Sequence, residues 1–197
     1  MRQLILIRHG ESTWNAEGRL QGAADIPLSE RGRRQARDLA PLVMELEPTD
    51  AVTSDLGRAM ETATLLGHPS AAPDVAWREA NLGAWTGRLA SDLIDLDGDG
   101  YNAWRIGRAT PPDGESWDDL VGRVSGALDL LIQREGRHMV VTHGGPIRAV
   151  CAHLLGLGPA SIVPVSPASV TIVDVDAVPR LRAFNLTSIH APQETAE

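Results

Sequence analysis

Leu-Ile-Leu-Ile-Arg-His-Gly at residues 4–10 is the stretch that decides the fold of this 197-residue chain. Its four consecutive branched aliphatic residues predict a short strand buried on both faces, as strands are in the interior of a parallel sheet. Gly10 ends the strand and lets the backbone turn closely around a bound group. An arginine followed by a histidine at the carboxyl end of such a strand suits an anion of the size of phosphate.

Strand patterns and helix patterns alternate along the rest of the chain. Further strands are predicted at 50–54, 75–77, 139–142, 170–175 and 181–184, and helices at 30–47, 59–66, 116–135 and from Pro146 onward. This order predicts an α/β fold, a three-layer α/β/α sandwich around a mostly parallel central sheet, with the last two strands as an antiparallel edge.

The length of the chain suits one domain over residues 1–197. Residues 89–114 are expected to be irregular and partly helical, and to form an insertion that lies over the site like a lid. The tail from about residue 190 onward is expected to be disordered.

Composition excludes several classes of function. The formal net charge of −8 argues against nucleic-acid binding, and no apolar run is long enough to suggest a membrane span or a signal peptide. The single cysteine, Cys151, rules out an internal disulfide and fits a cytoplasmic protein. All 18 basic residues are arginine, so a Walker-A lysine, a pyridoxal Schiff base and a lysine general base are excluded.

Candidate site residues follow the predicted strands. Arg8 and His9, then Arg58, Glu79 and His143, each come at or soon after the end of a strand. Because the carboxyl ends of parallel strands meet at one edge of a sheet, these side chains are expected to converge on a ligand crevice.

Four ordered segments carry a resemblance to a known family. They are Arg8–Asn15, which reads RHGESTWN; residues 54–63 around Arg58; Glu79 with Gly83 and Gly87; and Thr-His-Gly-Gly at 142–145. Together they resemble the histidine phosphatase superfamily, in its phosphoglycerate mutase-like branch, over residues 2–155. The resemblance implies a metal-independent phosphomonoester hydrolase that uses no cofactor.

The resemblance also implies a role for each residue. His9 would be the nucleophile that becomes phosphorylated, and Glu79 would be the general acid and then the base. His143 would donate a hydrogen bond to the transferring group, and the catalytic set would include Arg8 and Arg58. The phosphate-binding residues would be Arg8, Asn15, Gln21, Gly22, Arg58, His143 and Gly144. No metal ligand is expected, because the clustered positive charge would repel a cation.

Each residue also has a purely structural interpretation. Arg58 could start a helix, His143 could cap one, and Glu79 could be a surface carboxylate. Asp-Leu-Asp-Gly-Asp-Gly at 95–100 imitates the start of an EF-hand loop, but the twelfth position is Ile106 instead of glutamate, so this stretch is interpreted as a solvated turn.

Three functions remain as alternatives: a phosphatase, a cofactor-dependent phosphoglycerate mutase, and a non-catalytic phosphate-binding module. In mutases of this family the glutamate typically lies in an E-R-x-Y-G run followed by a lysine, whereas this chain has Glu-Ala-Asn-Leu-Gly at 79–83 and Ala90 near the lysine position. Only 63 residues separate Glu79 from His143, which is the compact spacing of the phosphatases. The phosphatase is therefore favoured.

The substrate is expected to be a small phosphate ester, with no nucleic-acid or membrane partner, and the chain to be a monomer or a homodimer. Six residues are candidates to line the mouth of the site or to pack a lid over it: Trp14, Gln21, Trp85, Trp104, Arg105 and Arg108.

Overall fold

The computed structural model describes residues 2–187, and its strands form one six-stranded sheet in the order β3-β2-β4-β1-β5-β6. The strands are β1 (Arg2–Arg8), β2 (Asp50–Thr53), β3 (Ala72–Pro73), β4 (Gly136–Thr142), β5 (Val170–Asp174) and β6 (Arg180–Leu186). β1, β2, β3 and β4 pair in parallel, whereas β5 pairs antiparallel with both β1 and β6. The mostly parallel sheet with an antiparallel edge is confirmed.

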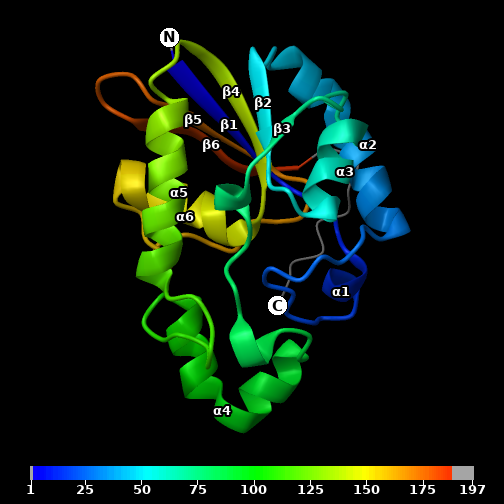
Figure 1. The fold of residues 1–197 in the computed structure, drawn as a ribbon, viewed down its shortest axis with the longest axis vertical. Coiled ribbons are helices and arrows are strands. Elements are labelled where there is room, and N and C mark those ends of the chain that lie inside the picture. The colour runs from blue at the N-terminus through cyan, green and yellow to red at the C-terminus, as the bar shows by residue number, and fades with distance from the viewer. Residues whose placement is uncertain (1, 188–197) are drawn as a thin grey trace.

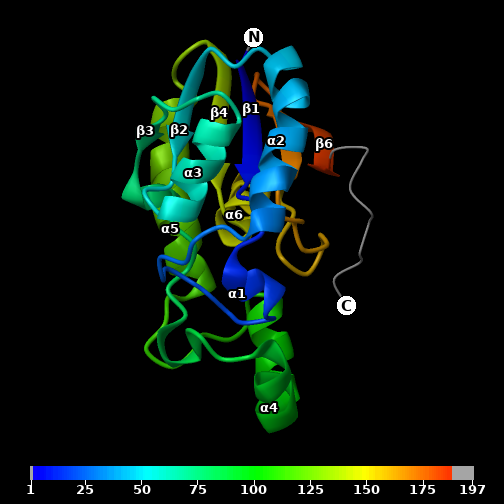
Figure 2. The ribbon, with the colours of Figure 1, turned by 90° about the vertical axis from the view of Figure 1, so that its right-hand side faces the viewer.

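Helices cover both faces of this sheet. They are α1 (Thr13–Ala16), α2 (Glu30–Glu45), α3 (Gly57–Leu65), α4 (Ala90–Arg105), α5 (Trp117–Leu131) and α6 (Gly144–Leu155). α2 and α3 lie on one face and α5 and α6 on the other, while α4 extends beyond the end of the sheet where β1 stops (Figures 1 and 2). The three-layer α/β/α sandwich is therefore confirmed.

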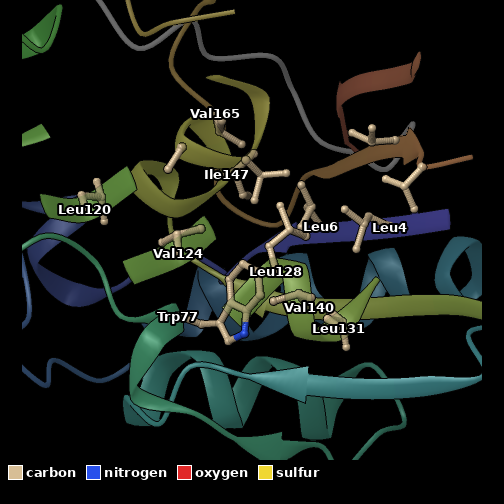
Figure 3. Close-up of a cluster of buried hydrophobic side chains, with 14 residues drawn as sticks. Leu4, Leu6, Trp77, Leu120, Val124, Leu128, Leu131, Val140, Ile147 and Val165 are labelled. Carbon is tan, nitrogen blue, oxygen red and sulfur yellow. The ribbon is translucent and has the colours of Figure 1, made fainter. Parts of the chain in front are cut away.

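Alternate residues of β1 pack into two different cores. Leu4 and Leu6 join the cluster formed with α5 and α6, as Figure 3 shows, and Ile5 and Ile7 join the cluster formed with α2 and α3. All four side chains are fully buried. Each such side chain contributes roughly 1.5–3 kcal/mol on leaving water, so this central strand is held from both sides and its carboxyl end is fixed in place.

Residues 75–77 are not the strand that their apolar character predicted. They form a 3₁₀ turn (η1, Val75–Trp77), because the Asp74 side chain accepts a hydrogen bond from the Ala76 N–H at 2.8 Å. The third strand is the two-residue β3, just before this turn. Trp77 is buried in the core against α5 (Figure 3). The turn therefore serves to position this large side chain in the core and does not extend the sheet.

Two element boundaries differ from expectation. α5 ends at Leu131, and Gly136 does not stop that helix but begins β4, where its φ of 132° and its contact with Thr49 leave no room for a Cβ. α6 begins at Gly144, two residues before Pro146, with His143 as its N-cap. The earlier start of α6 places glycine N–H groups beside His143.

The insertion is more ordered than its sequence predicts. It contains α4, whose only non-helical residue is Asp97, with φ −155° and ψ 75°. The Asp97 carboxylate accepts the Gly100 N–H at 2.9 Å, so this side chain caps the second half of the helix. The interpretation of residues 95–100 as a solvated turn is wrong, because they form this capped kink.

Residues from about 190 onward lie outside the described part of the chain. Within residues 2–187, no helix combines the length and the apolar character needed to cross a bilayer.

Candidate active site

A cavity of about 210 Å³ lies at the carboxyl ends of the parallel strands. Among the residues that line it are eight expected at the site: Arg8, His9, Asn15, Gln21, Gly22, Arg58, Glu79 and Gly144. His143 lies directly behind this lining, fully buried, with its ring centroid 4.9 Å from that of His9. The structure therefore brings together all nine of the predicted residues, from segments more than 130 residues apart.

The hydrogen bonds of His9 assign the tautomer of its imidazole. Nδ1 lies 2.6 Å from the carbonyl oxygen of Gly10, which can only accept, so Nδ1 carries the proton. Nε2 accepts from Nε of Arg58 at 3.2 Å. The lone pair of Nε2 therefore points toward the cavity. When a phosphoryl group binds, its oxygens can accept the Arg58 N–H instead, which leaves this lone pair free to attack phosphorus.

The pKa of His9 is held well below its ordinary value of 6.5. Burial is the main cause, and the positive charges of Arg58 and Arg8 lower this pKa further. The imidazole is therefore neutral at neutral pH, which is the state that a nucleophile requires.

Arg58 is held in place by backbone carbonyls. It lies in the first turn of α3 and is 1% exposed, and its NH1 and NH2 groups donate to the carbonyl oxygens of Ala24 and Gly22 at 2.6 and 2.8 Å. Its pKa is lowered to about 10, mainly by burial, so the guanidinium stays charged at neutral pH. Arg8 is partly buried and donates from NH1 to the carbonyl of Val165, while its buried Nε has no partner among the described residues.

His143 is positioned by a residue that sequence analysis did not identify. Its Nε2 lies 2.9 Å from Oγ of Ser54, and its buried Nδ1 has no partner among the described residues. The pKa of His143 is also well below 6.5, chiefly because of burial and then because of His9 and Arg58. When the Ser54 hydroxyl donates to Nε2, Nδ1 carries the proton and can donate it to a ligand. Ser54 lies within one of the four quoted segments, but no sequence pattern shows which way a serine hydroxyl points.

Glu79 is held by two backbone N–H groups, one of which lies at the start of α6. The Gly145 N–H is 3.2 Å from both carboxylate oxygens, and the Ala80 N–H donates to Oε1 at 2.9 Å. A Cβ on residue 145 would overlap Oε1 of Glu79, so only glycine allows this approach. The carboxylate is fixed at the cavity wall beside Gly144.

Asn15 reaches the cavity from α1, and Gln21 reaches it from the loop that follows this helix. Asn15 and Ser12 form a capping box at α1, in which the Asn15 side chain accepts the Ser12 N–H at 3.2 Å. This bond leaves the amide NH₂ of Asn15 free of the cap and able to donate. Oε1 of Gln21 is buried without a partner among the described residues. Gly22 adopts φ 54° and supplies the carbonyl that holds Arg58.

The six residues expected at the mouth of the site divide into two groups. Gln21, Trp104 and Arg105 line the cavity, whereas Trp14, Trp85 and Arg108 are not among its lining residues. Trp85 instead packs edge-on against Trp104, with ring centroids 5.5 Å apart. Lining residues that sequence analysis missed include Arg19, Tyr101, Trp117 and Arg148.

Unfolding is expected to become easier as the pH falls below 6.5. His9 and His143 have folded-state pKa values well below 6.5, so below that pH the unfolded chain binds protons that the folded chain does not. As the pH falls below 6.5, the titration of each histidine is expected to lower the free energy of unfolding by up to about 1.4 kcal/mol per pH unit, until the pH reaches its folded-state pKa.

Urea denaturation between pH 7 and pH 5 measures this effect. The difference in slope between the wild type and His9→Asn isolates one histidine from the other titrating groups, and the variant is expected to have the shallower slope. Equal slopes would contradict a neutral, buried His9.

The geometry defines a class of protein: an α/β enzyme with a neutral, oriented histidine between arginines, which is suited to phosphoryl chemistry. A family model described as histidine phosphatase superfamily (branch 1) matches residues 4–187. The chain belongs to this superfamily, and it is a phosphatase.

Two relatives show the range of names within the family. A probable phosphoglycerate mutase from Enterobacter sp. (strain 638) is 38% identical over 167 residues, covering 80% of this chain and 76% of the relative. A glucosyl-3-phosphoglycerate phosphatase from Mycolicibacterium vanbaalenii is 37% identical over 170 residues, with the same coverage. Among solved structures, a mycobacterial glucosyl-3-phosphoglycerate phosphatase complexed with VO3 has a TM-score of 0.88 and 32% identity, over 95% of this chain and 100% of its own.

Proposed function

We propose that the protein hydrolyses small phosphate monoesters without a metal ion, through a phosphohistidine on His9. The observation that carries this proposal is the paired hydrogen bonding of His9, with Nδ1 on the Gly10 carbonyl and Nε2 facing the cavity beside Arg58. We also propose that residues 1–197 are a single domain, since one six-stranded sheet carries both cores, and that the protein acts in the cytoplasm, which its single cysteine fits.

In the first step, Nε2 of His9 attacks phosphorus and the bond from phosphorus to the ester oxygen breaks. The arginines Arg8 and Arg58, with Asn15 and the N–H of His143, stabilise the phosphoryl oxygens. Glu79, in its protonated form, gives its proton to the leaving oxygen, so the alcohol departs neutral.

In the second step, water attacks the phosphohistidine. Glu79, now a carboxylate, takes a proton from the water, the bond from phosphorus to Nε2 breaks, and inorganic phosphate leaves. His9 returns to its neutral form and Glu79 to its protonated form, so atoms and charge balance over the cycle. The arginines supply the positive charge that a metal would otherwise provide.

The cavity wall favours hydrolysis over mutase chemistry. Next to Glu79 the lining residues are Ala80 and Leu82, where the mutase pattern has arginine and tyrosine. A mutase must hold a bisphosphorylated intermediate and shield its phosphohistidine from water. With apolar side chains at these two positions, the water attack is the expected outcome.

Hydrolysis of p-nitrophenyl phosphate in the presence of EDTA tests the proposal. The wild type is expected to keep its full activity in EDTA and to form inorganic phosphate from 3-phosphoglycerate. Loss of activity that a divalent metal restores would contradict metal independence. Formation of 2-phosphoglycerate as the main product would identify a mutase.

Gly145→Ala is expected to lower kcat/KM by about 10²-fold, because the new methyl group displaces the Glu79 carboxylate by about an ångström. The loss should be larger for 3-phosphoglycerate than for p-nitrophenyl phosphate, since nitrophenolate leaves without a proton. Kinetics with both esters measure this effect.

Gly126→Ala in α5 is the matched control, because its added methyl group meets no atom within 4 Å. It should leave both rates unchanged. Equal losses for the two esters in Gly145→Ala would contradict the general-acid role of Glu79.

A further inference from the structure

The segment that carries Glu79 is irregular. Residues 78–82 lie between the 3₁₀ turn η1 and a second such turn, η2 (Gly83–Trp85), and belong to no helix or strand. A general acid must be held close to its place relative to the leaving oxygen, because a displacement of about an ångström costs about 10²-fold in rate. The backbone of this segment therefore needs contacts from elsewhere in the fold.

Arg123 binds this backbone at three points. From α5 it donates with NH1 to the carbonyl oxygens of Ala76 and Arg78, both at 2.9 Å, and with NH2 to that of Glu79 at 3.2 Å. The same guanidinium forms a fork with Glu115, from Nε to Oε1 at 2.7 Å and from NH2 to Oε2 at 2.8 Å. These bonds use all five N–H groups of a guanidinium, so Arg123 has no donor left for a ligand.

Glu115 holds the far end of the segment. Its Oε2 accepts the Asn81 N–H at 3.2 Å, and its own N–H donates to the Asn81 carbonyl oxygen at 2.7 Å. The pair of Arg123 and Glu115 therefore contacts the backbone at residues 76, 78, 79 and 81, on both sides of the carboxylate. The two-pronged geometry of an arginine and a carboxylate fixes orientation as well as distance.

The origin of this contact is rigid. Arg123 lies on α5 between Leu120 and Val124, and both of these side chains are buried in the core. Neither Arg123 nor Glu115 lines the catalytic cavity, whereas Glu79 does. Glu79 is thus held at two ends, by Arg123 at its backbone carbonyl and by the Gly145 N–H at its carboxylate.

We infer that Arg123, joined to Glu115, is a positioning residue for proton transfer: it anchors the backbone of Glu79 to α5 and so sets where the carboxylate meets the leaving oxygen. This inference rests on the proposed function, which gives Glu79 the role of general acid. Arg123 itself touches neither the substrate nor the reacting atoms.

A matched pair of esters tests the inference. Phenyl phosphate and p-nitrophenyl phosphate share the aryl ring but differ in their need for a proton. Phenol has a pKa of about 10, like tyrosine, so phenolate leaves poorly unless it is protonated, whereas nitrophenolate leaves without a proton. The value of kcat/KM reports the step in which the ester bond breaks. Arg123→Gln is expected to lower it by about 10²-fold for phenyl phosphate and by less than about fivefold for p-nitrophenyl phosphate.

A double variant shows whether Arg123 acts through Glu79. Residues that act independently multiply their losses, whereas residues that act as a unit do not. Adding Arg123→Gln to Glu79→Gln is therefore expected to lower kcat/KM for phenyl phosphate by less than about threefold more. A merely structural role for Arg123 would instead lower it by the same factor in both backgrounds.

Arg123→Lys keeps the charge and most of the stem but has all its donors on one nitrogen, so an intermediate loss is expected. It answers the question if the glutamine variant folds poorly. Arg137→Gln is the matched control. The Arg137 guanidinium also joins a backbone carbonyl, that of Leu46, to a carboxylate, that of Glu47, but at the start of β4. This control should leave both rates unchanged.

Three results would overturn the inference: no loss in the Arg123 variants, equal losses for the two esters, or multiplied losses in the double variant. Failure of the proposed general acid appears elsewhere, in Glu79→Gln alone, as equal losses for the two esters. In that case the double variant still decides whether Arg123 acts through residue 79.

Discussion

His9→Ala is expected to slow hydrolysis of p-nitrophenyl phosphate by about 10⁴-fold or more, the scale on which removal of a nucleophile acts. The imidazole is 2% exposed, its Nδ1 proton is used by the Gly10 carbonyl, and its Nε2 faces the cavity. Among the described residues that line the cavity, no other combines a neutral nitrogen lone pair with this placement between arginines. Steady-state kinetics at pH 7 measure the loss.

His153→Ala is the matched control for this variant. His153 is an exposed histidine near the end of α6, bonded to Asp129 at 3.3 Å and not among the residues that line the cavity. Its replacement should change kcat/KM by less than about twofold. If His9→Ala kept more than a tenth of the activity while folded, another residue would be the nucleophile.

Arg58→Ala is expected to lower kcat/KM by about 10³-fold, and Arg58→Lys by about 10²-fold. The guanidinium contacts Nε2 of His9 and is aimed by the carbonyls of Gly22 and Ala24, so it meets the phosphoryl oxygens in a fixed orientation. Lysine restores the charge but not the planar fork. The two variants therefore separate the contribution of charge from that of orientation.

Urea denaturation provides the control for the Arg58 variants. Arg58→Ala removes a buried charge, which favours folding, and leaves two backbone carbonyls without their donors, which disfavours it. The folded fraction of this variant must therefore be verified at the assay temperature. Arg88→Ala, a replacement outside the cavity lining, should leave the activity unchanged. Equal activity in Arg58→Lys and the wild type would contradict a role for guanidinium geometry.

Sequence analysis located the sheet and the reacting groups because their signals are local. Four branched aliphatic residues in succession favour a strand buried on both faces, as β1 is, and the residue after such a strand lies at the carboxyl edge of the sheet. This is why His9 and His143, more than 130 residues apart, were expected near each other, and the structure places their rings 4.9 Å apart. The roles of these residues in catalysis stay predictions.

Other features depend on tertiary contacts that a sequence does not contain. Residues 75–77 have strand-like side chains, but a single capping bond from Asp74 folds them into a turn. Asp97 caps the second half of α4 from within the helix. The composition of residues 95–100, rich in Asp and Gly, does not distinguish such a capped kink from a loop.

Site residues were missed for the same reason, and two of them show why. Ser54 and Arg148 are ordinary residues in sequence, and their importance comes from what they face across the fold: Nε2 of His143 and the end of α4. The local pattern predicts where a side chain is attached, whereas packing decides which atoms it meets.

Rapid quenching of the enzyme during turnover of p-nitrophenyl phosphate, followed by peptide mass spectrometry under alkaline conditions that preserve phosphohistidine, tests the central claim most directly. The result predicted here is a single transient phosphoryl group on Nε2 of His9, absent from the His9→Ala protein. A phosphoryl group on Ser12, Thr13, His143 or any other side chain, or turnover with no covalent intermediate under conditions where the phosphoenzyme should accumulate, would contradict the mechanism.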